Sequence, residues 1–205
     1  MHNLACVRKF YKEHLQKYGE DIRGLGWFEK EEYQRRFQIA IKGLDLSGRQ
    51  ILDIGCGFGG LYDAIERFPG IRYFGIDILP EMIQIARKRH PDGTYISGDF
   101  LSMELPVFDY VFCIGSLNIS DSGFDAYFLE ATAKMKSIAR KMVVMNFLCD
   151  GSSLIKGPYH IQDVEILRKK FPEATIIYDD GLPGEAFLFI YQDGSNPARS
   201  QEALQ

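Results

Sequence analysis

The stretch "RQILDIGCGFGGLYDAIERF" combines an acidic residue with closely spaced glycines. Asp53, Gly55, Gly57 and Gly59 give D-x-G-x-G-x-G, while the overlapping set that ends at Gly60 fits G-x-G-x-x-G. The apolar run before the glycines is typical of a buried strand, and the apolar spacing after them indicates a helix. A glycine-rich turn between a strand and a helix exposes backbone N–H groups that a ligand can approach. The turn is therefore a predicted ligand site.

The carboxylate of Asp53 helps to choose between two ligands of such a turn. G-x-G-x-x-G is the fingerprint of dinucleotides, whose pyrophosphate a fixed nearby carboxylate would repel. S-adenosylmethionine brings an ammonium and a sulfonium group and no phosphate, so the acidic residue favours it. In the alternative interpretation, Asp53 only caps the following helix or bonds the backbone of the turn.

Asp77 closes the next predicted strand, 22 residues after Gly55. A carboxylate at this position can accept hydrogen bonds from both ribose hydroxyls of an adenosine that lies across the strand ends. Both candidate ligands contain adenosine, so Asp77 supports the site without choosing the ligand. The alternative is that Asp77 caps the helix that begins near Pro80.

Composition limits the class of protein. A chain of 205 residues with 46% apolar residues fits a single globular domain, and its net charge of −4 argues against a partner held by phosphate contacts. The N-terminus has no apolar signal-peptide core, and no apolar run is long enough for a membrane helix. The four cysteines are scattered without a C-x-x-C pair. We expect a cytoplasmic protein with neither a nucleic-acid nor a membrane partner.

Hydrophobic periodicity predicts alternating helices and strands, and hence a mostly parallel sheet covered on both faces. The last two predicted strands are separated by only about six residues, so they should pair antiparallel. The predicted helices are 3–18, 28–44, 60–68, 80–90, 124–138 and 160–171, and the predicted strands are 50–55, 71–77, 94–99, 108–115, 141–148, 174–179 and 185–192. We expect one domain over 1–192, with a helical cap over 1–48, a core over 49–192 and a disordered tail over 193–205.

The motifs "LDIGCGFG", "GIDILPEMI", "SGDF" and "FDYVFCIGSLN" follow one another at suitable spacing. In these motifs the chain resembles the class I S-adenosylmethionine-dependent methyltransferases over residues 33–192. The resemblance implies a Rossmann-like α/β fold with a seven-stranded sheet of order 3-2-1-4-5-7-6, in which the last strand is antiparallel and helices cover both faces. The segment upstream, with a tryptophan and an "RF" pair, is similar to small and mostly uncharacterised methyltransferases that act on small molecules.

The resemblance also implies which residues bind S-adenosylmethionine. The implied positions are Gly55, Gly57, Gly59 and Asp53 for the methionine part, Asp77 for the ribose, Ile78, Met82, Asp99 and Phe100 for the adenine, and Ile114 and Gly115 near the transferable methyl. In similar enzymes an arginine upstream of the first strand binds the cofactor's carboxylate, a task that suits a bidentate guanidinium. Arg36 is the candidate, with Arg35 beside it. A solvated helix face is the alternative.

A general base is less clearly marked. His160 follows the fifth strand, where an imidazole could take a proton, and Tyr159 could orient or stack on an acceptor. The alternative is that His160 only begins a helix. In the first helix, His14 with Tyr11 and Tyr18 could form a lid, or could simply pack in the core.

The sequence therefore predicts a methyltransferase that methylates O, N or C of a small organic molecule. The sequence lacks an N-P-P-Y run, which is typical of enzymes that methylate a nucleic-acid base. We expect no metal, although the oxygen-bearing side chains of Asn146, Asp150 and Asp121 leave that point open. Three alternatives remain: a non-catalytic S-adenosylmethionine-binding module, an NAD-type oxidoreductase and an aminopropyl transferase. The lack of a Tyr-x-x-x-Lys pair argues against the oxidoreductase. The acceptor and the oligomeric state are not predicted.

Overall fold

The computed structural model describes residues 4–119, 123–150 and 158–192. These residues form a seven-stranded sheet of order β3-β2-β1-β4-β5-β7-β6. The strands are β1 Gln50–Ile54, β2 Arg72–Asp77, β3 Thr94–Ser97, β4 Phe108–Ile114, β5 Ala139–Leu148, β6 Ala174–Tyr178 and β7 Glu185–Tyr191. The order is the one that the sequence motifs implied.

The direction of the strands also agrees with the prediction. Strands β1 to β5 pair in parallel, whereas β7 runs antiparallel to both β5 and β6. Residues 179–184 connect β6 to β7, and so short a connection cannot cross over the sheet as a parallel pair requires. The last two strands therefore form the expected hairpin.

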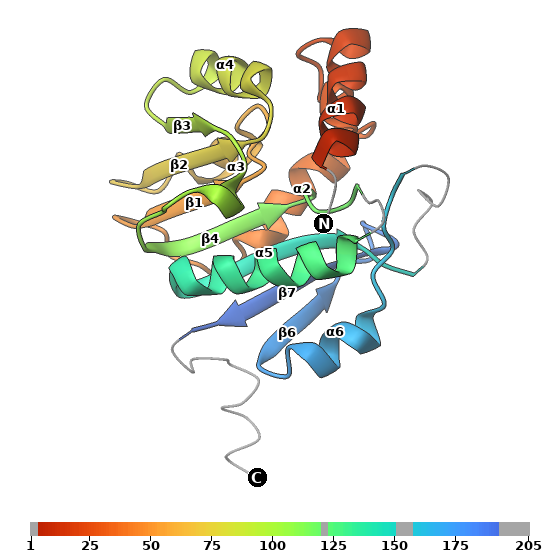
Figure 1. Ribbon diagram of the computed structural model, residues 1–205. Helices are drawn as coiled ribbons and strands as arrows, with labels where there is room; N and C mark the ends of the chain where they lie inside the picture. Colours follow the sequence, from red (N-terminus) through yellow and green to blue (C-terminus); the bar gives the residue numbers. More distant parts are fainter. Residues whose placement is uncertain (1–3, 120–122, 151–157, 193–205) are drawn as a thin grey trace.

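Helices cover both faces of the sheet and one of its ends. The helices are α1 Leu4–Tyr18, α2 Lys30–Ala40, α3 Gly60–Ile65, α4 Pro80–Arg89, α5 Phe124–Ile138 and α6 Val164–Lys170, with short 3-10 turns η1 Ile22–Leu25 and η2 Phe100–Ser102. Figure 1 shows α5 lying across one face, with α2 and α3 behind the sheet and α1 standing apart beyond it. This arrangement separates two apolar cores, one on each face.

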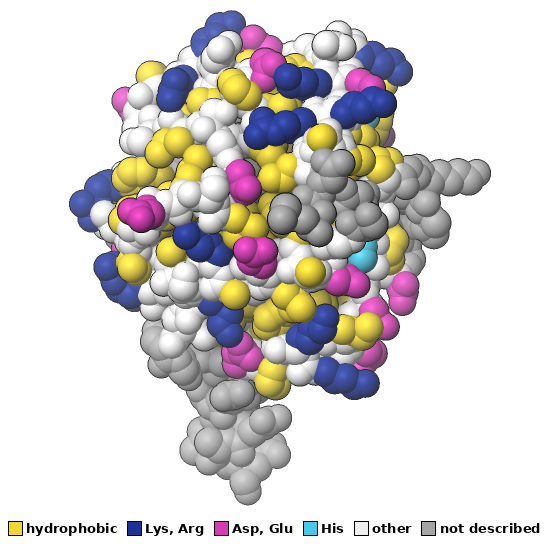
Figure 2. Space-filling view, in the orientation of Figure 1, with side chains coloured by type: hydrophobic (Ala, Val, Ile, Leu, Met, Phe, Trp, Pro, Cys, Tyr) yellow, Lys and Arg dark blue, Asp and Glu magenta, His cyan; other side chains and the backbone are white. Residues whose placement is uncertain are grey.

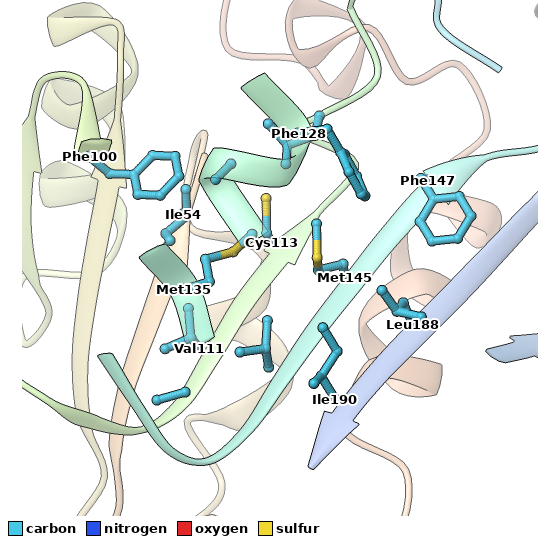
Figure 3. Close-up of a cluster of buried hydrophobic side chains, with 14 of the residues drawn as sticks. Ile54, Phe100, Val111, Cys113, Phe128, Met135, Met145, Phe147, Leu188 and Ile190 are labelled. Carbon is cyan, nitrogen blue, oxygen red and sulfur yellow. The ribbon is translucent and has the colours of Figure 1, made fainter. Parts of the chain in front are cut away.

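Strand β4 lies at the centre of the sheet, between the two cores. Every residue of β4 is buried, as expected for an apolar run covered by helices on both sides. In Figure 3, Phe128 and Met135 of α5 point toward Cys113 of β4 and Met145 of β5. The strand ends that face the candidate site are thus held by close packing on either side.

Helix α1 is tied to α4 by polar contacts. The Arg8 guanidinium donates to the backbone oxygen of Ile78 over 2.6 Å. One turn further along, Lys12 Nζ lies 3.6 Å from Glu81 Oε1. The contacts hold α1 over the carboxyl ends of the strands, away from the packed core.

Several element boundaries differ from the sequence prediction. The helix expected over 28–44 covers only Lys30–Ala40, and the one expected from His160 begins at Val164, because the Asp163 side chain caps two backbone N–H groups there. The turn η1 was not predicted; Asp21 caps it and Gly26 ends it in the left-handed conformation. The predicted tail lies outside the described residues. Within 4–119, 123–150 and 158–192, no helix is long and apolar enough to cross a membrane.

Candidate cofactor site

A void of about 980 Å³, open to solvent, lies at the carboxyl ends of β1, β2 and β4. Figure 2 shows apolar side chains gathered between the regions that Figure 1 assigns to α4 and α1, with Lys and Arg side chains beside them. The residues of the void that the sequence implied as cofactor contacts are Asp53, Gly55, Gly57, Asp77, Ile78, Met82, Asp99, Phe100, Ile114 and Gly115. The structure thus brings together ten positions from four separate motifs.

The glycine turn after β1 adopts the conformation that only glycine takes without strain. Gly55, Gly57 and Gly59 have φ of 73°, 52° and 91°. Gly59, however, is not among the residues that line the void. It caps α3, and a Cβ atom there would lie 2.6 Å from the His90 ring. Gly59 therefore faces the packing behind the turn, which differs from the role that the sequence implied.

Asp53 is buried beneath the turn, with 2% of its surface exposed. Its Oδ2 accepts a hydrogen bond of 2.6 Å from the hydroxyl of Tyr73 on β2. Burial raises the pKa of Asp53 to about 7, although the Tyr73 bond acts in the opposite direction. The carboxyl is therefore poised to gain or lose a proton near neutral pH.

Asp77 links the glycine turn to the loop that precedes α4. Its Oδ2 accepts from the backbone N–H of Gly57 and its Oδ1 from that of Leu79, each over 2.9 Å. Helix α4 is capped at Leu79 without a side-chain bond, so Asp77 is not its N-cap residue. Burial raises the pKa of Asp77 to about 6, while these backbone bonds and Arg8 oppose the shift. Because a carboxylate offers about four acceptor positions, Asp77 can still accept from a ligand.

Asp99 and Phe100 complete the adenine side of the void. Asp99 Oδ1 accepts from the backbone N–H of Leu101 over 3.0 Å and so fixes the turn η2. This places Phe100, which is 4% exposed, against the wall of the void. Asp53, Asp77 and Asp99 thus line one void at, or just beyond, the ends of three neighbouring strands.

Helix α1 provides the cover that the sequence suggested, but with a different set of residues. Tyr11 lines the void together with Leu4 and Val7. Burial raises the pKa of Tyr11, and the nearby Asp77 carboxylate adds to the shift. His14 does not line the void; its ring packs on Phe10 with centroids 4.1 Å apart. This side of the void is therefore mostly apolar.

A second and much smaller void adjoins the first at Gly115 and Trp27. Tyr159 lines this second void, next to Phe10. His160 lines neither void: its ring stacks on Phe124 with centroids 4.1 Å apart. Burial lowers the pKa of His160, which holds the ring neutral. Of the two candidate catalytic residues, the structure brings only Tyr159 to the end of β4.

Arg36 lies elsewhere than the sequence suggested. The side chain is 3% exposed and does not line the void, so it is not a solvated helix residue either. Its Nε donates to Glu185 Oε2 over 2.8 Å, and its Nη2 bonds the other oxygen of that carboxylate. Sequence reasoning missed Glu185, although a single charged residue in an apolar strand signals a buried partner. Tyr73 gave no such signal, because tyrosine is common in buried strands.

A seven-stranded sheet with a reversed last strand, a glycine turn after β1 and acidic residues at the next two strand ends define the class I methyltransferase fold. Comparisons with known proteins agree. Residues 51–137 match the family model described as a methyltransferase domain. Over these residues the chain is therefore similar to a methyltransferase domain, and its fold is that of the class I S-adenosylmethionine-dependent methyltransferases, as its motifs predicted.

Several of the similar proteins are named as methyltransferases. Demethylmenaquinone methyltransferase of Chlorobaculum tepidum is 27% identical over 140 residues, which cover 63% of this chain and 55% of that protein. Magnesium protoporphyrin IX methyltransferase of Synechocystis, solved with S-adenosylhomocysteine, matches 93% of this chain and 100% of its own with a TM-score of 0.71 and 14% identity. N-methyltransferase NodS of Bradyrhizobium japonicum, also solved with S-adenosylhomocysteine, matches 92% of this chain and 99% of its own with a TM-score of 0.70 and 15% identity. The chain spans about half the length of the curated relatives it matches.

Proposed function

We propose that this protein is a methyltransferase that uses S-adenosylmethionine to methylate a small organic molecule. The observation that carries the proposal is the acidic lining of the large void, where the carboxylates of Asp53, Asp77 and Asp99 come together. These carboxylates attract the ammonium and sulfonium groups of S-adenosylmethionine, whereas they would repel the pyrophosphate of a dinucleotide. The structural neighbours solved with S-adenosylhomocysteine support the same choice of ligand.

The residues of the void fit this cofactor. S-adenosylmethionine supplies a methyl group on a positively charged sulfur, so the protein must chiefly align the acceptor and exclude water. Asp77 is available to accept from the ribose hydroxyls, and Phe100 offers an apolar wall for the adenine. Leu4, Val7 and Tyr11 form an apolar cover over one side of the void. Because α1 and the strand ends line one void, we propose that the cap and the core act as one domain.

The end of β4 beside Gly115, where the large and the small void meet, is the proposed place for the acceptor. The family resemblance puts the transferable methyl near it, and Tyr159 is the proposed residue to contact an acceptor there. Demethylmenaquinone and magnesium protoporphyrin IX, named for two similar proteins, are small organic acceptors. The acidic composition favours such an acceptor over a nucleic acid. A cytoplasmic location stays a prediction from composition.

Calorimetric titration with S-adenosylmethionine, S-adenosylhomocysteine and NAD tests the proposal. We expect binding of the first two ligands only, with loss of binding in Asp53→Asn and no change in Asp92→Asn, which alters an exposed acidic residue remote from the void. Binding of NAD alone would indicate an oxidoreductase. Cofactor binding without S-adenosylhomocysteine formation over a broad acceptor panel would indicate a binding module, and a preference for decarboxylated S-adenosylmethionine would indicate an aminopropyl transferase.

A further inference from the structure

A buried polar cluster lies behind Trp27 and joins three elements of the fold. It consists of Arg36 from α2, Asn146 from β5 and Glu185 from β7, which are 3%, 1% and 6% exposed. Arg36 forms a two-pronged pair with Glu185, and Asn146 Nδ2 donates to the same carboxylate over 3.0 Å. Two strands therefore fix the plane of the guanidinium group, because a bidentate pair restricts both partners in orientation.

Stability alone does not account for this cluster. Taking two charges out of water costs about as much as their attraction returns, and apolar residues of similar size often serve as well. A rigid guanidinium plane has a further use, since aromatic rings stack on it. The Arg36 guanidinium carbon lies 4.0 Å from the ring centre of Trp27, within the range of a cation–π contact.

Trp27 is the residue that this contact fixes in place. Its ring covers Gly115 at the end of β4 so closely that a Cβ atom on Gly115 would lie 2.4 Å from Trp27 Cζ2. Trp27 also lines both the large void and the small one. The indole is therefore part of the boundary between the proposed cofactor and acceptor spaces.

We propose that Arg36 is a positioning residue: paired with Glu185, it holds the Trp27 indole over Gly115, and Trp27 thereby shapes the acceptor end of the site. The part that concerns the acceptor rests on the proposed function, whereas the positioning of Trp27 does not. This role replaces the binding of the cofactor's carboxylate, which the sequence suggested for Arg36. Arg36 Nη1 has no hydrogen-bond partner among the described residues and is the atom that the rival role would use.

Trp27 is the single tryptophan of the chain, so its fluorescence reports directly on its position. In the double variant Arg36→Met/Glu185→Gln no buried charge is left unpaired, and the new amide oxygen can still accept from Asn146. We expect its Trp27 emission to shift to the red and to become more accessible to acrylamide. The matched control is Arg35→Met/Asp179→Asn, which removes a more exposed pair beside the same turn of α2 and should leave the emission unchanged. Arg36→Lys keeps the charge but loses the two-pronged hydrogen bonding of the guanidinium, and should shift the Trp27 emission by an intermediate amount.

Binding of two probes separates the two roles of Arg36. S-adenosylhomocysteine carries a carboxylate, whereas 5′-methylthioadenosine lacks the amino-acid end. We expect the ratio of the two dissociation constants to be the same in wild type, Arg36→Lys and the double variant. Loss of about tenfold or more for S-adenosylhomocysteine alone, with unchanged Trp27 emission, would overturn the proposal and return Arg36 to the carboxylate. If the wild type bound neither probe, the proposed function would fail, and the fluorescence would still decide the positioning role.

Discussion

The hydroxyl of Tyr73 bonds the buried carboxyl of Asp53 across 2.6 Å. The two residues come from adjacent parallel strands, in which Tyr73 pairs with Ile51 and Gly75 with Asp53. The bond therefore joins two diagonal neighbours on one face of the sheet, and Asp53 also lines the void. Since the pKa of Asp53 is about 7, this floor changes charge in the neutral range.

The affinity for S-adenosylhomocysteine should rise as the pH is raised from 6 to 8. The ammonium of this ligand favours ionised Asp53, and a carboxyl with a pKa of about 7 becomes ionised over that range. Tyr73→Phe removes a bond that lowers the pKa, so the midpoint of the rise should move to higher pH. Calorimetric titrations in steps of pH measure both. The control ligand 5′-methylthioadenosine keeps the ribose near Asp77 and lacks the ammonium, so an equal rise for it would assign the effect to another group.

Asp53→Asn should stabilise the ligand-free protein at pH 8 but not at pH 4. The pKa of Asp53 is about 7 in the folded chain and near 4 in the unfolded chain. The contribution of this carboxyl to stability is therefore complete below pH 4 and is lost as the pH rises through about 7. Asparagine carries no charge, and its oxygen can still accept from Tyr73. Thermal melts at the two pH values test this. The control is Asp45→Asn, because the pKa of Asp45 is shifted in the opposite direction. Hydrogen bonds from Ser47 lower the pKa of this exposed carboxyl, so its removal should not raise the melting temperature at pH 8.

Asp77→Ala should weaken cofactor binding and also loosen the glycine turn. The turn depends on Asp77 through the Gly57 N–H bond, and lost hydrogen bonds of this kind cost roughly 1 to 3 kcal/mol. Asp77→Asn keeps one carbonyl oxygen for a backbone N–H and should retain more of the melting temperature than Asp77→Ala. Melts and titrations of both variants with S-adenosylhomocysteine separate the two effects. Full affinity in Asp77→Ala would remove this residue from the site.

The sequence was sufficient where a local pattern determines the structure. The buried strands, the hairpin that ends with β7 and the acidic strand ends follow from periodicity and spacing, and the structure places Asp53, Asp77 and Asp99 around one void. The position of Arg36 could not be predicted in this way. Its partner Glu185 is 149 residues away, and only the packed sheet brings the two together.

The same limit applies to residues near the acceptor side. His160 and Tyr159 are neighbours in sequence, yet the chain turns so that only Tyr159 lines a void, while His160 stacks on Phe124. His90, at the end of α4, is largely buried, with 10% of its side chain exposed and its ring packed on Tyr62. Which side of a loop faces a ligand depends on tertiary contacts, and periodicity carries no information on it.

Arg8→Met should make α1 a looser lid. Arg8 donates to the Ile78 oxygen, beside the void that Leu4, Val7 and Tyr11 cover, and methionine keeps the aliphatic stem but cannot donate. Loss of this charge-assisted bond should speed the release of S-adenosylhomocysteine by roughly 10-fold, the equivalent of about 1.5 kcal/mol. Stopped-flow displacement measures the release rate, and hydrogen exchange should show faster opening of α1 than of α5. The matched control is Lys9→Met on the next residue, whose ammonium is exposed and lies 3.9 Å from Glu13, so its release rate should equal that of the wild type. If both variants released the ligand at the wild-type rate, α1 would be a fixed wall of the site and not a lid.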